Sequence, residues 1–437
     1  MSIFARAESF LVPKLRQVAH FATKQGIAVA GNLLYGLLCV RVLPIADYAK
    51  FAVLFGYMGS LSMLLDVGIA GTLAPLVGEQ ISNLPLIANY VASIRQLILR
   101  IYAVMAPLAM AGFVLLVHRQ HWGALVVVQM LAVLLVTAWF ARVSSSYGAV
   151  LILRRDRSRY YRAQIIGSLG SLGLLLVFWL LHAMNLYVAI LLNVAQIIFI
   201  AISYYWRARH LLGVKGHSSV GQRKAIVRLA MPNVPSSIFY ATQGQVMLML
   251  ITIFGHNASS VANIGALARL GQIMVFASQM NPILVEPFFA KLQEARLKRT
   301  YLLAVALVAS CGAAYSALAF LYPGIFLWIL GPKYSQLRLE VSLVVLSSTI
   351  HYVGGFIWVI HTARRFVYWW IAVVNIALTL ILEAVFIWKV DLSSVRNVLI
   401  LNVAGAALTF LVILASGVYG FWHGPQKTEH SAEHSAV

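Results

Sequence analysis

Charged residues are scarce in this chain, and acidic ones are the scarcest. Only 10% of the 437 residues are Asp, Glu, Lys or Arg, against roughly 25% in an ordinary soluble domain. Hydrophobic residues make up 61% of the sequence, and the mean hydropathy is +0.86. A surplus of apolar surface on this scale indicates that lipid is the solvent for most of the chain.

The signatures of soluble enzymes are missing as well. There is no phosphate-binding loop of the type Gly-x-x-x-x-Gly-Lys-Ser/Thr, so nothing argues for an ATP-driven pump. No His/Cys pattern has the spacing of a metal site, and we expect neither a metal nor a cofactor. The two cysteines, Cys39 and Cys311, lie within apolar segments and predict no disulfide. We therefore expect a transporter rather than an enzyme.

The N-terminal segment lacks the apolar core and small-residue cleavage site of a signal peptide. Its apolar residues have a spacing that predicts an amphipathic helix lying on the inner membrane surface. These residues are Phe10, Leu11, Leu15, Val18 and Phe21.

Apolar segments of membrane-spanning length recur along the whole chain. A spanning helix needs about 20 mainly apolar residues to cross ~30 Å of hydrocarbon. The short alternating stretches of a transmembrane barrel are absent. The sequence therefore predicts an all-α polytopic membrane protein with about 12 transmembrane helices. The predicted spans are 24–43, 50–76, 98–117, 122–150, 163–182, 186–206, 232–254, 260–285, 301–322, 337–361, 367–388 and 396–420. Apolar spacing over 87–101 predicts a helical extension ahead of the third span.

Basic residues are distributed unevenly between the predicted loops. Of the 33 Lys and Arg residues, 24 fall on one side of the membrane, seven on the other and two inside spans. Because short cytoplasmic loops retain Lys and Arg, the first side is predicted to be cytoplasmic, with both termini there. The formal net charge of +21 thus reflects loop placement, and no polar domain is available to bind nucleic acid.

The chain also repeats itself with a shift of about 210 residues. Shifted by 212 positions, segment 43–76 lies on segment 255–288, and shifted by 210, Arg154 lies on Arg364. The two shifts differ by only two positions, so the first six spans correspond to the last six with the same orientation. We predict an N-terminal six-helix half (1–210), a basic cytoplasmic linker (211–228), a C-terminal six-helix half (229–424) and a polar cytoplasmic tail (425–437).

Two arginines fall inside predicted spans, where a buried charge is costly and usually faces a cavity or a partner. Arg142 lies 12 residues before Arg154, about 18 Å along the helix. Arg269 lies about 13 Å from the outer end of its span. We interpret both as lining a cationic cavity that holds an anionic ligand. The alternative is a structural pair or a side chain that reaches the interface.

Further polar residues lie within the spans. Asp66 is predicted either to form an ion pair, with one of these arginines or with Lys24 or Arg41, or to bind a coupling ion. Uncharged side chains gather on the first, seventh and eighth spans, where they must find partners or water. Binding of sugar hydroxyls and helix–helix hydrogen bonding both remain open for them. The candidates for the cavity are Asn32, Gln245, Gln272 and Gln279.

Segment 43–79 contains Leu-Pro-Ile-Ala-Asp-Tyr-Ala-Lys-Phe-Ala and later Leu-Leu-Asp-Val-Gly-Ile-Ala-Gly-Thr-Leu. Between the ninth and tenth predicted spans stands Gly331-Pro332-Lys333-Tyr334. The first segment resembles the signature region of polysaccharide transporters, and the second resembles their Gly-x-x-Tyr turn. These transporters are the O-antigen and capsule repeat-unit flippases of the multidrug/oligosaccharidyl-lipid/polysaccharide exporter superfamily. The resemblance covers essentially the whole chain.

The resemblance implies two six-helix bundles arranged as a V around a central cavity that opens alternately to each side. It implies a substrate of undecaprenyl-diphosphate-linked oligosaccharide, moved between leaflets of the bacterial inner membrane. Family members carry basic residues in the lumen, which is the role it suggests for Arg142 and Arg269. The implied partners are membrane lipids, a polysaccharide polymerase and a chain-length regulator.

Three alternatives follow from the same features. A cation-coupled multidrug exporter of the superfamily should have more acidic cavity residues. A lipid II flippase of the superfamily typically has fourteen spans, and this chain has room for twelve. A membrane-embedded glycosyltransferase or polymerase would normally have large periplasmic loops or a carboxylate-rich site, and the predicted outer loops are short.

Overall fold

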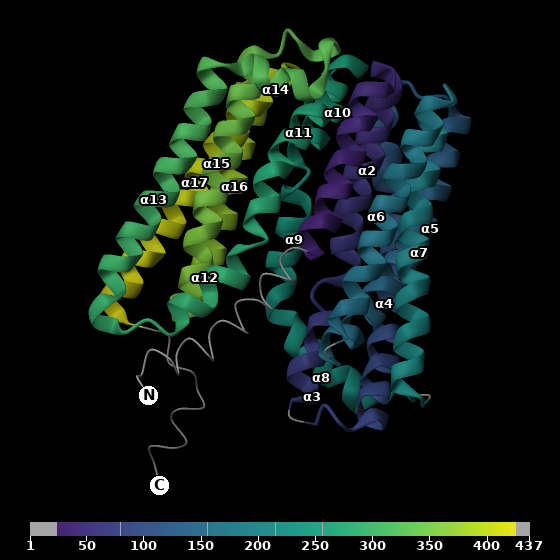
Figure 1. Ribbon diagram of the computed structural model, residues 1–437, viewed down its shortest axis with the longest axis vertical. Helices are drawn as coiled ribbons and strands as arrows, with labels where there is room; N and C mark the ends of the chain where they lie inside the picture. Colours follow the sequence, from purple (N-terminus) through teal and green to yellow (C-terminus); the bar gives the residue numbers. More distant parts are fainter. Residues whose placement is uncertain (1–23, 79, 155, 215, 256, 425–437) are drawn as a thin grey trace, which may run out of the picture. The chain divides into compact units, whose positions relative to one another are not determined.

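The computed structural model describes residues 24–424 apart from positions 79, 155, 215 and 256. These residues form α-helices and short 3₁₀ helices and contain no strand (Figure 1). The amphipathic helix predicted for Phe10 to Phe21 and the polar tail 425–437 lie outside the described residues.

Eleven helices of the described chain are long and apolar enough to cross a membrane, or twelve if one bent pair counts as a single span. The predicted all-α polytopic membrane architecture with about 12 transmembrane helices is confirmed. The bent pair is α9 (Val234–Gln243) and α10 (Val246–Phe254), which meet at 55°. The single helices are Lys24–Val42, α2 (Ile45–Asp66), α4 (Leu84–Val117), α5 (Ala124–Leu153), α6 (Arg157–Leu180), α7 (Leu186–Leu212), α11 (Ala258–Ser278), α13 (Glu294–Leu321), α15 (Arg338–Arg364), α16 (Trp369–Lys389) and α17 (Val395–His423).

Shorter helices fill the connections. They are η1 (Ala70–Thr72), α3 (Leu73–Val77), η2 (His118–Gln120), α8 (Val220–Ala230), η3 (Met231–Asn233), α12 (Asn281–Ala290), α14 (Pro323–Leu330) and η4 (Pro332–Tyr334).

Three predicted spans are interrupted, which corrects their predicted bounds. Span 50–76 breaks where α2 ends, because Val67 and Gly68 adopt left-handed backbone with φ of 43° and 79°. Span 260–285 breaks between α11 and α12, and span 232–254 breaks between α9 and α10. The apolar sequence continues across the breaks, so hydropathy does not reveal them.

The helical extension predicted ahead of the third span is present. Helix α4 runs unbroken for 34 residues, about 51 Å, which exceeds the ~30 Å hydrocarbon core. Asn83 caps its first turn by accepting a hydrogen bond from the Leu86 amide at 3.1 Å. The extension provides a surface against which short helices outside the core can pack.

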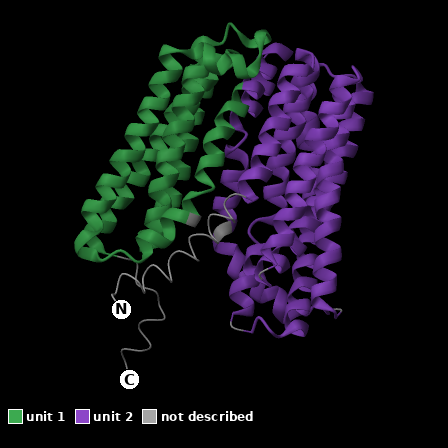
Figure 2. Cartoon of the chain, viewed as in Figure 1, with its two compact units in different colours: residues 1–23, 267–437 green, residues 24–266 purple. Residues whose placement is uncertain are grey.

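The described chain divides into two compact units, one from Lys24 to Ala266 and one from Leu267 onward (Figure 2). The division falls inside α11 and not at segment 211–228, because α8, α9 and α10 pack on α2 and α4. These packing units and the repeat halves are different divisions, and the division at the linker stays a prediction.

Helix bounds nevertheless follow the shift seen in the sequence. Shifted by 212 positions, α2 lies on 257–278, and α11 spans Ala258–Ser278; each is followed by a break and a shorter helix. A matching contact recurs at the ends of α5 and α15. Nη1 of Arg154 donates to the carbonyl of Ile81 at 2.7 Å, and Nη2 of Arg364 donates to the carbonyl of Leu292. Ile81 and Leu292 are 211 positions apart, so both arginines hold equivalent loops.

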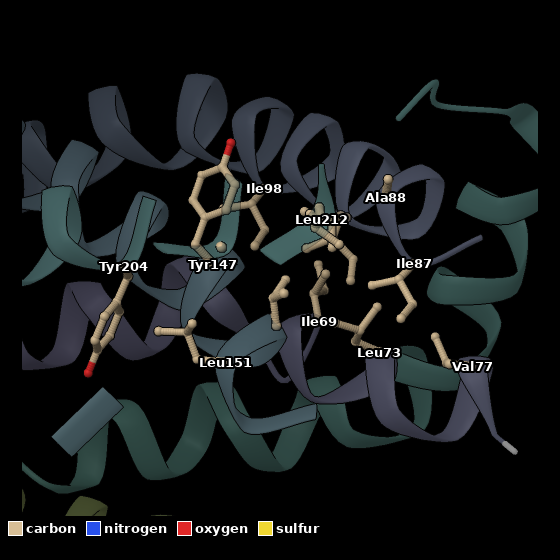
Figure 3. Close-up of a cluster of buried hydrophobic side chains, with 14 of the residues drawn as sticks. Ile69, Leu73, Val77, Ile87, Ala88, Ile98, Tyr147, Leu151, Tyr204 and Leu212 are labelled. Atoms are coloured by element: carbon tan, nitrogen blue, oxygen red, sulfur yellow. The ribbon is translucent and has the colours of Figure 1, made fainter. Parts of the chain in front are cut away.

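A buried apolar cluster fixes the segment after the α2 break. Leu73 and Val77 of α3 pack with Ile87 and Ile98 of α4, and Leu151 of α5 closes the cluster (Figure 3). All five side chains are buried. Burial at roughly 25 cal/mol per Å² of apolar surface holds the short helix in place, and thereby the turn that follows Asp66.

Candidate functional site

A polar site begins where α2 ends. The carboxylate of Asp66 accepts a hydrogen bond from the backbone amide of Ala70 at 2.9 Å, which stabilises the turn into η1. Helix α2 has 22 residues, or about 33 Å, enough to cross the hydrocarbon core. Asp66 is the last residue of this helix, at the point where the chain breaks into η1.

Asp66 lines a cavity of about 750 Å³ formed within the unit Lys24–Ala266 by α2, η1, α3, α5, α6 and α7. Ligand sites in proteins typically occupy ~300–1,000 Å³, so the volume suits a small organic ligand. Hydroxyl, amide and charged groups form its polar lining. They are Ser62, Asp66, Ser144, Ser145, Arg157, Tyr160, Gln164 and Tyr204.

One hydroxyl group of the cavity lining is available for a further hydrogen bond. Ser145 Oγ is buried and has no hydrogen-bond partner among the described residues. Tyr204 donates its hydroxyl to the carbonyl of Tyr160 at 3.3 Å, and the two rings stack at 4.8 Å between centroids. A flat aromatic surface flanked by hydroxyl and amide groups is able to bind a polyhydroxylated ligand.

Arg142 lies on α5 one residue beyond the lining residue Ala141. Its exposed fraction is 7%, and its guanidinium carbon lies 3.9 Å from the ring centroid of Trp139. Its Nε is buried without a hydrogen-bond partner in the described part of the chain. Arg142 is about 27 Å from the start of α5 and about 17 Å from its end, so it remains deep in the unbroken helix.

Arg269 lies at the middle of α11, with an exposed fraction of 4%. Its Nη1 donates to Oε1 of Gln272 at 3.2 Å, so Gln272 orients this guanidinium. Gln279 follows the end of α11, where its backbone N–H donates to the carbonyl of Val275 at 3.3 Å. All three residues belong to the unit that begins at Leu267.

Asn32 takes part in helix–helix hydrogen bonding. Its Oδ1 accepts from Nε2 of Gln196 at 2.7 Å, and Oε1 of Gln196 accepts from Ser171 at 2.8 Å. This network, which is buried at Gln196 and Ser171 and exposed at Asn32, joins the helix Lys24–Val42 to α7 and α6. Of the two interpretations left open for Asn32, the structure provides direct support for the helix–helix one.

Gln245 occupies the break between α9 and α10. Its side chain packs on α2 at Gly56, where an added Cβ would lie 2.6 Å from Oε1 of Gln245. An alanine at position 56 would displace the ends of the Gln245 and Leu248 side chains. Gln245 thus contacts the helix that ends in Asp66, although it does not line the cavity.

The ion pair predicted for Asp66 with Lys24 or Arg41 is not formed among the described residues. Nζ of Lys24 lies 3.4 Å from Oγ of Ser158 instead. Lys24 and Arg41 are also about 25 Å apart along a single helix, so they cannot both neutralise one carboxylate. The prediction that Asp66 binds a coupling ion stays open.

Of the predicted site residues, only Asp66 lines the cavity. The hydroxyl groups of the lining were not predicted from the sequence, because a hydroxyl carries no charge that makes its burial in lipid conspicuous. A signal was present in the run Ser144-Ser145-Ser146, which is unusual within an apolar span, and in the four-residue spacing of Tyr160 and Gln164. A single cavity holding Asn32, Arg142, Gln245, Arg269, Gln272 and Gln279 stays a prediction.

No protein-family model matches the sequence, nor does any curated protein. Solved structures do match the fold. An inward-facing multidrug resistance MATE family transporter of the MOP superfamily is 15% identical, with a TM-score of 0.63 and coverage of 90% of this chain and 95% of that one. The lipid II flippase MurJ, in an inward closed conformation, is 11% identical, with a TM-score of 0.64 and coverage of 94% of each chain.

A third similar structure is a MOP superfamily transporter from Pyrococcus furiosus, described by a reversed polarity of its binding pocket. It is 14% identical, with a TM-score of 0.55 and coverage of 92% of this chain and 94% of that one. All three neighbours are transporters or flippases rather than enzymes. The chain therefore has the fold of MOP superfamily transporters.

Proposed function

We propose that this protein is a flippase that moves undecaprenyl-diphosphate-linked oligosaccharide units from the cytoplasmic to the periplasmic leaflet of a bacterial inner membrane. The observation that carries the proposal is the cavity beside Asp66, with its volume of about 750 Å³ and its hydroxyl and amide lining. Such groups hydrogen-bond sugar hydroxyls. The headgroup of a lipid-linked oligosaccharide cannot cross ~30 Å of hydrocarbon unaided.

The two buried arginines supply the second part of the recognition. Arg142 and Arg269 are deep within α5 and α11, and a guanidinium binds phosphate oxygens with charge-assisted hydrogen bonds. In this proposal each arginine binds phosphate oxygens of the substrate during transport, and the oligosaccharide occupies the polar cavity of the unit Lys24–Ala266. Alternating access then exchanges the headgroup between leaflets. A polysaccharide polymerase and a chain-length regulator would act on the product.

Asp66 is proposed as the site of the driving cation. Its carboxylate lines the cavity and accepts one backbone hydrogen bond, which leaves oxygen lone pairs for a proton or Na⁺. Binding of a cation there would couple an ion gradient to the change in access.

A cation-coupled multidrug exporter is the second candidate function, and Asp66 is the observation that favours it. A carboxylate in a cavity attracts cationic drugs. Two buried arginines repel them, and discrimination of this kind arises as much from repulsion as from attraction. The balance of buried charge thus favours an anionic substrate. A lipid II flippase would also bind a diphosphate, so it differs from the main proposal in its sugar.

The test is a reconstitution into liposomes that contain a fluorescent undecaprenyl-diphosphate oligosaccharide. A membrane-impermeant glycosidase added outside cleaves only the substrate in the outer leaflet. With the protein present, the cleaved fraction should rise above the half that is accessible at the start. The same liposomes loaded with ethidium, under an imposed proton or Na⁺ gradient, report drug export.

Sugar-lipid movement without ethidium export supports the proposal. Ethidium export without sugar-lipid movement assigns the protein to drug export and contradicts it. Lipid II offered in the same assay distinguishes the third possibility, because a lipid II flippase should move it in preference to other sugar lipids.

A further inference from the structure

The short helix α8 carries basic and apolar side chains on its surface, apart from the cavity described above. Ile226 and Ala230 are buried, whereas Val220 and Met231, at its two ends, are 60% and 59% exposed. A helix with basic and apolar residues exposed together is typical of a position in the membrane interface. It lies within the segment predicted from loop charge to be cytoplasmic.

Hydrogen bonds fix α8 to the extension of α4. Ser93 donates to Oε1 of Gln222 at 3.0 Å, and Nη1 of Arg223 donates to Oε1 of Gln96 at 2.8 Å. The Ser219 side chain caps the helix by accepting from the amide of Gln222. The surface that α8 presents is therefore held in place by its own contacts.

Between α8 and α4 lies a second cavity, of about 740 Å³. Four basic residues line it: Arg100 of α4 and Arg223, Lys224 and Arg228 of α8. No acidic residue belongs to the lining, and within the described residues Arg100, Lys224 and Arg228 form no ion pair. Like charges one turn apart on a helix repel, so an anion bound here would relieve an existing repulsion.

The rest of the lining is apolar, which identifies the kind of anion. Leu97, Val220, Val227, Met231 and Pro232 complete the cavity. A free phosphate ion needs cations but gains nothing from an apolar wall. The phosphate of a phospholipid stands beside its glycerol backbone and acyl chains, and basic pockets between membrane helices bind such headgroups.

We infer that the cavity between α4 and α8 binds the headgroup of an anionic phospholipid from the adjacent leaflet. Arg100, Lys224 and Arg228 contact the phosphate, and Val220, Val227 and Met231 contact the start of the acyl chains. This site does not depend on what the protein transports.

The test uses the purified full-length protein and native mass spectrometry of bound lipid, with short-chain phosphatidylglycerol and phosphatidylcholine as probes. The variant Arg100→Gln/Lys224→Gln/Arg228→Gln removes the free cations. Each basic residue near an anionic lipid surface contributes about fivefold to binding, so affinity for phosphatidylglycerol should fall about 100-fold. Binding of phosphatidylcholine should stay unchanged, which also reports that the variant is folded.

The matched control is Arg296→Gln/Lys298→Gln/Arg299→Gln at the start of α13, where the same three charges are exposed but line none of the described cavities. It should keep phosphatidylglycerol binding within about twofold of the wild-type value, because the lining of the cavity is intact. Equal losses in both triple variants would overturn the site, since the effect would then be bulk electrostatics. Equal binding of the two lipids, or displacement of lipid by an equivalent concentration of inorganic phosphate, would overturn it too.

Discussion

The two halves of the repeat break the same helix in different ways. Helix α2 ends at Asp66, whose carboxylate caps Ala70, and α11 ends 212 positions later at Ser278, whose hydroxyl donates to the carbonyl of Val275 at 2.7 Å. After each of these two helices the chain turns and forms a shorter helix. Because a serine suffices in the second half, the break itself does not require a carboxylate. The difference makes Asp66 a candidate for a role beyond this turn.

At other positions that the repeat places in correspondence, some side chains are the same in both halves and others differ. Arg154 and Arg364 make the same contact to a loop carbonyl, so this feature serves the architecture of both halves. The buried arginines are not shared. Shifted by 210 positions, Arg142 lies on Tyr352, and shifted by 212, Arg269 lies on Tyr57. Features common to both halves are structural, and those that differ are the candidates for function.

The largest expected effect concerns the unshared arginines. Arg269→Ala and Arg142→Ala should each reduce transport of the sugar lipid by at least about tenfold, because a charge-assisted hydrogen bond contributes about 1.5–3 kcal/mol. Tyr57→Phe, at the position equivalent to Arg269, loses only the bond from its hydroxyl to the carbonyl of Ala109 and should keep most activity. The reconstituted assay, with each protein matched for insertion, measures both. Normal transport by Arg269→Ala would remove it from the proposed site.

An intermediate effect is expected at the shared arginines, and on stability rather than on transport. Arg154→Met and Arg364→Met should each lower the free energy of unfolding by about 1.5–3 kcal/mol, the usual contribution of a hydrogen bond to a charged group. Because the contacts are equivalent, both losses should fall within this range of about 1.5–3 kcal/mol. Unfolding in mixed micelles followed by circular dichroism gives both values. A large loss for one variant and none for the other would break the equivalence of the halves.

The smallest expected effect distinguishes two glycines that the repeat places at equivalent positions. A Cβ added at Gly271 would lie 2.8 Å from Oγ of Ser348, whereas one at Gly59 has nothing closer than Nε2 of Gln245 at 3.9 Å. Gly59→Ala should therefore stabilise the protein by up to about 1 kcal/mol, the usual preference of helices for alanine. Gly271→Ala should lose that gain to the contact with Ser348. Thermal unfolding of the two variants side by side provides the test, and equal melting temperatures would contradict it.

Hydropathy and loop charge predicted the membrane class and the approximate spans because both depend on composition over about 20 residues. They missed the breaks at Asp66, Gly244 and Ser278, since these depend on single backbone conformations such as the left-handed Val67. The repeat was visible in the sequence because both halves keep Arg154 and Arg364 in matching places. Helix bounds in the structure then followed the same shift.

The candidate site was less accessible to sequence reasoning. Arg142 and Arg269 were predicted to be unusual because a charge is costly in lipid, and both are buried. The contact of Arg269 with Gln272 follows from the three-residue spacing of the two side chains on one helix. The contact of Asn32 with Gln196 joins two different helices, and spacing along the chain does not specify it. The serine run on α5 was overlooked because hydroxyls in a membrane helix usually bond to their own backbone, as Ser146 does to the carbonyl of Arg142.

The most direct measurement compares Asp66→Asn with Ser278→Ala in the reconstituted flippase assay under an ion gradient. Asparagine keeps an oxygen that accepts from the amide of Ala70, so the turn after α2 is preserved while the charge is removed. We expect Asp66→Asn to reduce gradient-driven transport of the sugar lipid at least about tenfold, since loss of an ionised hydrogen-bonding group costs about 1.5–3 kcal/mol. Ser278→Ala should keep the wild-type rate. Wild-type transport by Asp66→Asn, or equal losses in both variants, would contradict the account.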